Sequence, residues 1–285
     1  MTAPTIASVS TMGQTVPYIT VAELKRSPIS TQLHKLVPGS SDADRDAELG
    51  RIIMRASAMI NAEVTQNLAA TVDTEVGRVR VSDDGDLRIH CRSNPIIEVR
   101  SIAIGAEVRN LTEFTDPASQ VVLEPWRITI PRCAGGNWRR GARLWAKWTY
   151  VNGYPVTTLA QPAAAGDTHI VVSNPLGIEV GATDLAIEDG KWVEEHLVPS
   201  VVTGDTLTVP PLLFPHEAGV GVTALPNDLK EATLLLISRL HDTWSLSMGA
   251  ITHDGTGAAK GTAGRGGGGA MCDCKQILAP YRRMW

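Results

Sequence analysis

The hydrophobic pattern of this chain changes its period near residue 70, and that change constrains the fold more than any other feature. Between residues 42 and 66 the apolar residues recur three to four positions apart, which is the spacing of a helix. This apolar stripe consists of Leu49, Ile52, Ile53, Ala56, Met59, Ile60 and Val64. Ser41 suits an N-cap, and aspartates follow it in the first turns, where the helix dipole favours negative charge. The pattern predicts a long amphipathic helix over about 42–66.

After residue 70 the apolar spacing becomes two, which is the period of a β-strand. Val79, Val81, Leu87 and Ile89 flank the turn at 82–86, so a hairpin is expected there. Further strands are expected at 95–104, 120–124, 126–130 and 142–151. Short consecutive strands favour an antiparallel meander, and we expect the long helix to cover at least one of its faces. The predicted fold class is therefore α+β.

A second all-β segment follows from 156 to 224. Its short apolar runs are separated by turn sequences at 173–175, 188–190 and 203–205. A segment of this length suffices for a small β barrel or sandwich inserted into the chain. The rest of the ordered chain, residues 17–155 with 225–248, is expected to form one core of helices and strands.

Leu225-Pro226 introduces a second helix, because proline suits the first helical position. This helix is apolar nearly all round between Leu234 and Leu240, so it is expected to be buried on several sides. One side is assigned to the core and another to a neighbouring subunit. The predicted subunit-interface residues are Leu234, Leu235, Leu236, Ile237 and Leu240.

The chain begins with a polar segment, residues 1–16, which is expected to be a flexible arm without the pattern of a secretory signal. Thr20 and Glu23 then form a capping-box pattern that starts a short helix. The four cysteines are too few and too irregularly spaced for a disulfide framework, so maturation in a reducing cytoplasm is expected. No apolar run is long enough for a membrane span, and no membrane partner is expected.

Glycine is concentrated near the C-terminus, in the run GTAGRGGGGAMCDCKQ at 261–276. A dinucleotide site needs a strand before its glycines and an acid about twenty residues later, and this run has neither. The two thiols at Cys272 and Cys274 have the wrong spacing for structural zinc. Residues 249–270 are therefore interpreted as a flexible tether.

The tether ends in a short basic segment with an apolar edge, residues 271–285. Its expected role is to leave its own subunit and dock on a partner or on a neighbouring copy, folding on contact. The residues assigned to this contact are Ile277, Leu278, Tyr281, Arg282, Arg283 and Trp285.

Nothing in the sequence has the pattern of an active site, a metal site or a cofactor site. The seven histidines form no paired metal-ligand spacing, and no nucleophile motif occurs. The net charge of −4 argues against a protein that grips nucleic acid. Trp138 differs from the other tryptophans because it lies in a predicted turn beside Arg139 and Arg140, where it is a candidate for contact with a partner.

Several segments together resemble a known family. They are Tyr18–Leu24, Ala56–Ile60, Trp148–Pro155 with the following Thr157-Thr158-Leu159, Glu188–Gly190, Pro215–Gly219 and Ala224–Pro226. In this order and spacing they resemble head-to-tail adaptors, also called connector proteins, of tailed bacteriophages that infect actinobacteria. The resemblance spans residues 17 to 245, and none of its motifs is catalytic.

The resemblance implies a non-enzymatic virion subunit without cofactors, assembled in the host bacterial cytoplasm. Such subunits form a ring, commonly of twelve, at the portal vertex. The ring joins the portal protein to the next neck or tail protein and leaves an axial channel through which double-stranded DNA passes without sequence-specific binding. Three alternatives stay open: another neck component, such as a stopper or tail-completion protein, a binding module that uses the β insert, or an enzyme with an unrecognised site.

Overall fold

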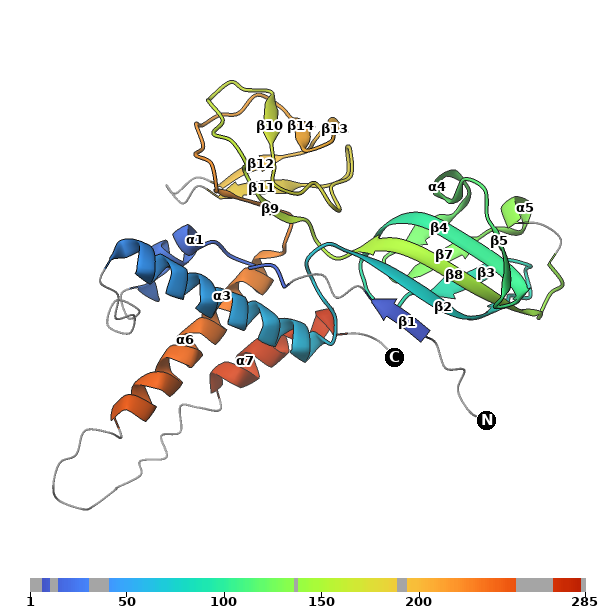
Figure 1. Cartoon of the computed structure of the whole chain (residues 1–285), viewed down its shortest axis with the longest axis horizontal. Coiled ribbons are helices and arrows are strands. Elements are labelled where there is room, and N and C mark those ends of the chain that lie inside the picture. Colours follow the sequence, from blue (N-terminus) through green and yellow to red (C-terminus); the bar gives the residue numbers. More distant parts are fainter. Residues whose placement is uncertain are drawn as a thin grey trace, which may run out of the picture.

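The computed structural model describes residues 7–10, 15–30, 41–135, 138–188, 194–249 and 269–282. Its helices and antiparallel strands form three units with separate hydrophobic cores: a helical unit, a curled sheet and a small β sandwich (Figure 1). The predicted α+β class is confirmed, including the inserted all-β segment. Among the described residues, no helix has both the length and the apolar character that crossing a membrane requires.

The helical unit brings together the two ends of the sequence. Its elements are α1 (Val21–Arg26), α3 (Asp42–Val64), α6 (Asn227–Gly249), α7 (Gly269–Leu278) and the 3-10 turn η1 (Ala279–Tyr281). Both predicted N-caps are present: Thr20 caps α1 with a full capping box, and the hydroxyl of Ser41 accepts a hydrogen bond from the Asp44 amide. The predicted stripe of α3 faces the core, where it packs against α6 and α7.

The curled sheet contains eight strands. They are β1 (Ala7–Ser10), β2 (Thr71–Val81), β3 (Leu87–His90), β4 (Ile96–Glu107), β5 (Asn110–Glu113), β6 (Val122–Glu124), β7 (Arg127–Ile130) and β8 (Arg143–Asn152). The order is β5-β4-β8-β2-β3-β7-β6, and β1 pairs with β2. The short helices α4 (Pro117–Gln120) and α5 (Arg132–Gly135) lie in its connections.

Two expectations about this sheet were wrong. The long helix was expected to cover one of its faces, but the sheet curls on itself and encloses its own core, so that β4 contacts β6. The apolar stripe of helix α3 instead packs against α6 and α7. The N-terminal arm also differs from expectation, because Ala7–Ser10 pairs in antiparallel register with β2. The rest of residues 1–14 lies outside the described residues.

The sandwich is built from residues 156–224. A four-stranded sheet contains β12 (Glu194–Leu197), β11 (Leu185–Glu188), β15 (Gly221–Thr223) and β9 (Val156–Thr158), and a three-stranded sheet contains β10 (His169–Val171), β14 (Thr206–Thr208) and β13 (Val201–Thr203). Side chains from both sheets share one core, which includes Leu159, Ile187 and Leu207. The predicted insert therefore has the architecture of a small sandwich.

The three units meet at a junction formed by residues 16–20, 66–70, 152–156 and 223–226. Its tightest point is Gly153, whose φ of +91° favours glycine. A Cβ added there would lie 2.6 Å from the carbonyl oxygen of Ala69. On either side, the Tyr154 amide donates to the Leu68 carbonyl and the Ala224 amide donates to the Pro155 carbonyl. Backbone hydrogen bonds thus join all three units within a few residues.

Candidate interaction surfaces

The C-terminal segment packs on its own chain, which differs from the expected docking on a partner. Leu278 is buried in the helical core, and Ile277 and Tyr281 are partly buried against it. The Tyr281 hydroxyl donates to the Asp228 carboxylate at 2.8 Å, and the Gln66 side-chain amide donates to the Tyr281 carbonyl. Arg282 forms an ion pair with Glu63. The reason for this fold-back is that the apolar edge of the segment fits between α3 and α6.

Other predictions for this region have no structural outcome. Arg283, Trp285 and the tether residues 250–268 lie outside the described residues, as does the side chain of Cys272. Cys274 is buried, and its thiol faces the carbonyl of Ala232 on α6 at 3.9 Å. No group of histidines, cysteines and acids suited to a metal ion occurs within the described part of the chain.

The predicted interface residues of α6 divide into two sets. Leu236 and Ile237 are buried in the core of their own chain, so their side chains are not available to a neighbouring subunit. Leu234, Leu235 and Leu240 keep part of their surface exposed. Of the five predicted residues, these three keep surface that a neighbouring subunit could contact.

The three predicted contact residues of the Trp138 turn also differ in exposure. Trp138, a candidate for contact with a partner, is half-buried and packs against the core of the curled sheet. Together with Phe114, Ala134 and Leu144 it lines an open pocket at this end of the sheet. Arg139 and Arg140 are exposed, as expected for a contact surface.

The most concentrated set of buried polar side chains lies inside the curled sheet. The Tyr150 hydroxyl donates to Glu75 at 2.6 Å, and the same carboxylate accepts from the Arg92 amide at 2.9 Å. The Ser93 hydroxyl donates to Asp73 at 2.8 Å. Burial, followed by the charge of Glu75, raises the pKa of Tyr150. These bonds hold the loop at 91–95 against β2 and β8, so the network positions a loop that reaches the junction.

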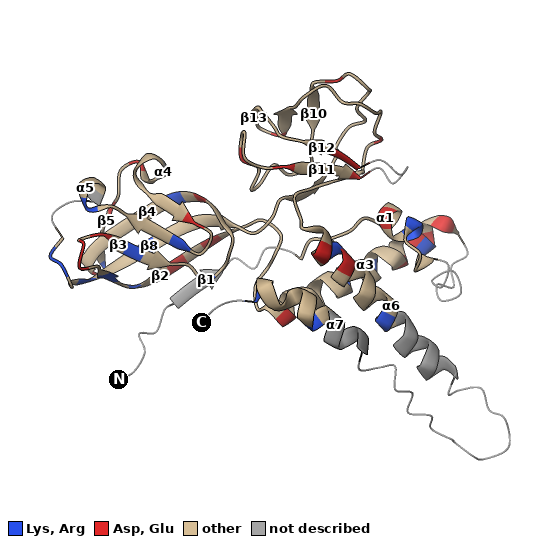
Figure 2. Cartoon of the chain, turned by 180° about the vertical axis from the view of Figure 1, so that it is seen from behind, with Lys and Arg blue, Asp and Glu red and all other residues tan. Residues whose placement is uncertain are grey.

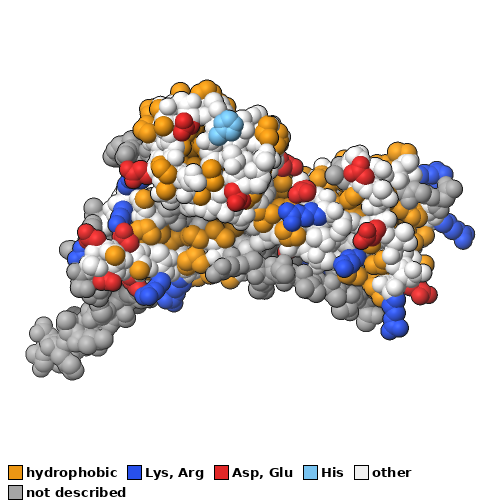
Figure 3. Space-filling model, turned by 45° about the horizontal axis from the view of Figure 1, so that its top comes forward, with side chains coloured by type: hydrophobic (Ala, Val, Ile, Leu, Met, Phe, Trp, Pro, Cys, Tyr) orange, Lys and Arg blue, Asp and Glu red, His pale blue; other side chains and the backbone are white. Residues whose placement is uncertain are grey.

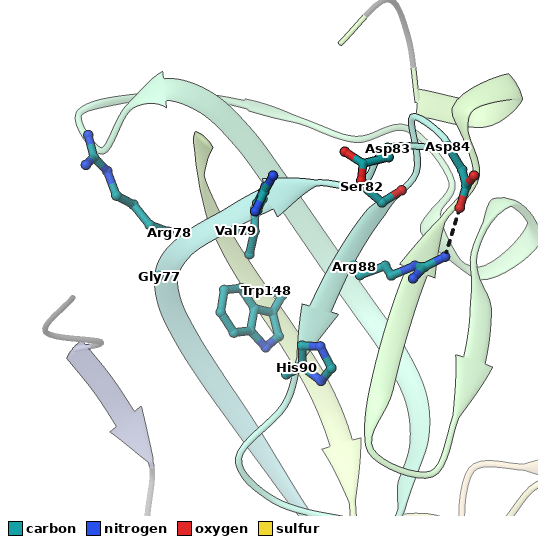
Figure 4. Close-up of a pocket in the computed structure, with 10 residues that line it drawn as sticks. Gly77, Arg78, Val79, Ser82, Asp83, Asp84, Arg88, His90 and Trp148 are labelled. Atoms are coloured by element: carbon teal, nitrogen blue, oxygen red, sulfur yellow. Dashed lines mark hydrogen bonds and ion pairs between the residues drawn. The ribbon is translucent and has the colours of Figure 1, made fainter. Parts of the chain in front are cut away.

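An open pocket of about 490 Å³ lies where β2 and β3 separate (Figure 4). His90 and Trp148 lie close together on one side of it, Arg88 pairs with Asp84 across the hairpin, and the side chain of Arg78 points away. Burial, followed by the Arg127 charge, lowers the pKa of His90, which favours its neutral form. Both arginines and aspartates line this opening, which suits polar contact with a partner surface.

Four cations form a row on the outer face of β2 and β8, which we name the basic stripe: Arg78, Arg80, Arg143 and Lys147. Arg80 lies directly opposite Arg143 in the antiparallel register, and Arg78 lies opposite Trp145. The Arg78 guanidinium lies 5.4 Å from the Trp145 ring centroid. All four cations are exposed, and within the described residues none forms an ion pair with an acid. Like charges directly opposite each other destabilise a strand pair, so the opposed Arg80 and Arg143 would gain from an acidic group of a partner.

The sandwich has the opposite charge. Residues 156–224 include nine acids and a single basic residue, Lys191. In the described part of the sandwich there is no lysine or arginine at all, and Figure 2 shows only acidic residues on its ribbon. Four of the acids have ion-pair partners: Glu188 pairs with Lys230 of α6, buried Glu195 pairs with His216 at 3.0 Å, and Asp184 and Glu194 both pair with His196. The exposed acids are Asp167, Glu179, Asp184, Glu194, Asp205 and Glu217.

Besides the exposed valines Val180, Val198 and Val201, apolar surface occurs at two places on the sandwich. A groove of about 290 Å³ lies between the sandwich and the start of α1, lined by Val16, Ile19 and Val156 among others. Figure 3 shows hydrophobic side chains in this hollow, above the helical unit. The second place is the loop tip of Leu213 and Phe214, where the Leu213 amide donates to Glu195 at 2.7 Å. The buried Glu195–His216 pair thus holds an exposed apolar tip in place.

Sequence reasoning missed the basic stripe and the charge of the sandwich. Counting charges over 156–224 alone would have found the acidic sandwich. The stripe could not be found in this way, because Arg80 and Arg143 are opposed only through the register of two strands that are far apart in sequence.

No protein-family model and no curated protein matches the chain. Two solved structures are similar to it over nearly its whole length. A chain of "Neck of empty GTA particle computed with C6 symmetry" is 13% identical, with a TM-score of 0.38, over 99% of this chain and 96% of that chain. A chain of "Virion of native gene transfer agent (GTA) particle" is 14% identical, with a TM-score of 0.31, over 98% and 96%.

Proposed function

We propose that this chain is a non-enzymatic structural subunit of a bacteriophage-type virion neck. In this role it forms a ring at the portal vertex that joins the portal protein to the next neck or tail protein. The ring leaves an axial channel for double-stranded DNA. The role requires no cofactor and no metal ion.

The observation that carries this proposal is the convergence of the family-like segments on the junction. Tyr18 donates from its backbone amide to Ser57, and the Leu68 amide donates to the Tyr18 hydroxyl. Gly153 contacts the backbone of residues 68 and 69. Thr223 and Ala224 both donate to the Pro155 carbonyl. Segments 18–24, 56–60, 148–155 and 224–226 are distant in sequence, yet they fix the mutual arrangement of the three units.

The division into three units also suits a ring subunit. Each unit has its own core, so each can present a separate surface without disturbing the others. Leu234, Leu235 and Leu240 of α6 are the apolar residues that we assign to intersubunit contact.

The overall charge suits a channel through which DNA moves. The chain carries a net charge of −4, and a protein that neutralises phosphates would gain affinity for DNA through counterion release. We expect acids to outnumber bases on the channel wall. A mapped channel wall rich in arginine and lysine would contradict this expectation.

Mass measurement of the purified protein tests the proposal, alone and with the portal protein of the same virion. The expected result is a closed ring, or a complex that attaches to the portal and is visible by electron microscopy. A stable monomer that ignores the portal would overturn the proposal. Attachment to the tail side alone would favour a stopper or tail-completion protein instead.

A further inference from the structure

We propose that the basic stripe of one subunit docks on an acidic patch of the sandwich of a second copy. The acidic patch consists of Asp184 and Glu194, with His196 between them and the exposed valines Val180 and Val198 beside them. Because this contact would connect neighbouring subunits of the ring, it rests on the proposed function and assigns a surface to it.

The basic stripe has an unbalanced charge in a single chain. Arg80 and Arg143 are opposed on neighbouring strands, and both are exposed without an acidic partner among the described residues. Lys147 and Arg78 extend the row along the same face. Trp145, half-buried at its centre, supplies an apolar surface. The stripe thus has an aromatic centre with a positively charged rim, which is a common composition of protein interfaces.

The acidic patch has the complementary composition. The Asp184 carboxylate lies 3.1 Å from the Nδ1 atom of His196, and the Glu194 carboxylate lies 3.3 Å from its Nε2 atom. These three side chains are exposed on the β12 side of the four-stranded sheet, where β12 is an edge strand. Val180 and Val198 are 55% and 42% exposed, and the Gly181 amide binds the Pro199 carbonyl, which holds the two valine segments together.

The two surfaces lie on different units, so their contact is heterologous. Arg80 and Arg143 lie at the end of the curled sheet far from the junction, because Thr71 and Asn152 occupy the junction end of the same strand pair. In Figure 1 the curled sheet extends to one side, whereas the sandwich stands above the helical unit. A contact between unlike surfaces repeats from copy to copy and closes into a ring when the rotation permits.

A second copy fits the basic stripe better than DNA does. Every copy supplies one sandwich, whose described part has no lysine or arginine, and one basic stripe. The two surfaces are therefore present in equal numbers. The chain as a whole is acidic, which disfavours the approach of a polyanion. Charge complementarity between copies therefore accounts for both surfaces, whereas DNA binding accounts for only one.

Two charge-reversed proteins test the contact. Arg80→Glu with Arg143→Glu makes both surfaces acidic, and Asp184→Lys with Glu194→Lys makes both surfaces basic. Each variant alone is expected to need at least about tenfold higher concentration to assemble, because like charges face each other across the contact. An equimolar mixture is expected to restore assembly, since each variant then meets the opposite charge on its neighbour. Mass photometry at several salt concentrations measures both effects.

Arg109→Glu with Arg132→Glu is the matched control, because it makes the same change in net charge at exposed arginines outside the stripe. This control is expected to assemble like the wild type, and all variants are expected to keep the wild-type circular dichroism and unfolding midpoint. Rings that form regardless of salt and of both reversals would overturn this contact and leave the proposed function intact. A wild-type chain that stays monomeric, even with the portal protein, would overturn both.

The mixture separates this contact from DNA binding. If Arg80→Glu with Arg143→Glu assembles normally but loses retention of double-stranded DNA in a filter-binding assay, the stripe is a DNA surface and the proposed contact is wrong. If the mixture restores rings, the contact is supported, and the rings are expected to contain an even number of subunits with alternating variants.

Discussion

At the scale of single residues, the junction depends on a backbone conformation that only glycine adopts without strain. Gly153→Ala is expected to destabilise the protein by more than the roughly 1–3 kcal/mol of backbone strain, because the new Cβ would lie 2.6 Å from the Ala69 carbonyl oxygen. Gly219→Ala is the matched control: its φ is +84°, but no atom lies within 4 Å of an added Cβ. Denaturant unfolding of both variants measures the difference. Equal losses would mean that the close approach at Gly153 contributes nothing.

The cysteines provide a second test at this scale. Burial raises the pKa of the Cys91 thiol, and the nearby Glu75 carboxylate raises it further. Because the thiolate is the reactive form, Cys91 is expected to stay unmodified by iodoacetamide at pH 8, whereas exposed Cys133 reacts. Peptide mass mapping after timed alkylation measures the two rates. Urea serves as the control, since unfolding should make the rates equal, and a fast Cys91 in the native protein would contradict the network around Glu75.

At the scale of elements, α7 closes the helical unit by packing on α3 and α6. Leu278→Ala removes a fully buried side chain, so it is expected to lower the free energy of unfolding by about 2–5 kcal/mol. Lys275→Ala, on the exposed side of the same helix, is expected to change it by less than about 0.5 kcal/mol. Chemical denaturation measures both variants. A Leu278→Ala protein as stable as the wild type would mean that α7 does not pack there in solution.

Elements whose signals are local could be predicted from the sequence, and elements that depend on distant partners could not. The capping box of Thr20 and Glu23 and the stripe of α3 are present as predicted, because both are set by residues within a few turns of each other. The packing of α7 depends on the contact of Tyr281 with Asp228, and the two residues are far apart in the chain. The apolar edge of the C-terminal segment could be recognised in the sequence, but the surface of α3 and α6 on which it packs could not.

The same limit applied to the candidate surfaces. Arg139 and Arg140 were recognised from a turn sequence and are exposed, whereas the adjacent Trp138 is partly buried against the core of the curled sheet. The basic stripe depends on the register that places Arg80 opposite Arg143. Such surfaces require the pairing of strands, which the alternation of apolar residues within one strand does not specify.

At the scale of the whole molecule, the expectation of a single helical and β core was too simple. The apolar face of a sheet can be covered by a helix or by the sheet itself, and the sequence pattern is the same in both cases. Here the sheet curls until β4 contacts β6, which leaves α3 free to pack on α6 and α7. The all-β insert was predicted as a barrel or a sandwich because its short apolar runs and turn sequences are local signals.

The independence of the sandwich leads to a prediction for the whole chain. Val156 pairs with Thr223, and the Ala224 amide donates to the Pro155 carbonyl at 2.9 Å, so the two ends of the sandwich lie side by side. A chain in which Gly-Gly replaces residues 156–224 is expected to fold, since two residues span such a strand pair. The sandwich expressed alone is expected to fold as well, because its core contains only its own residues.

Circular dichroism and thermal unfolding test both pieces, and a two-dimensional amide NMR spectrum shows whether the isolated sandwich is ordered. The shortened chain loses the ion pair between Lys230 and Glu188 and the packing of Gly221 on Thr20, so a lower unfolding midpoint is expected. Lys230→Met in the shortened chain is the control, because it removes the ammonium group that loses its ion pair with Glu188 on deletion. If the shortened chain unfolds even with this substitution, the helical unit and the curled sheet require the sandwich, and the three cores are one cooperative structure.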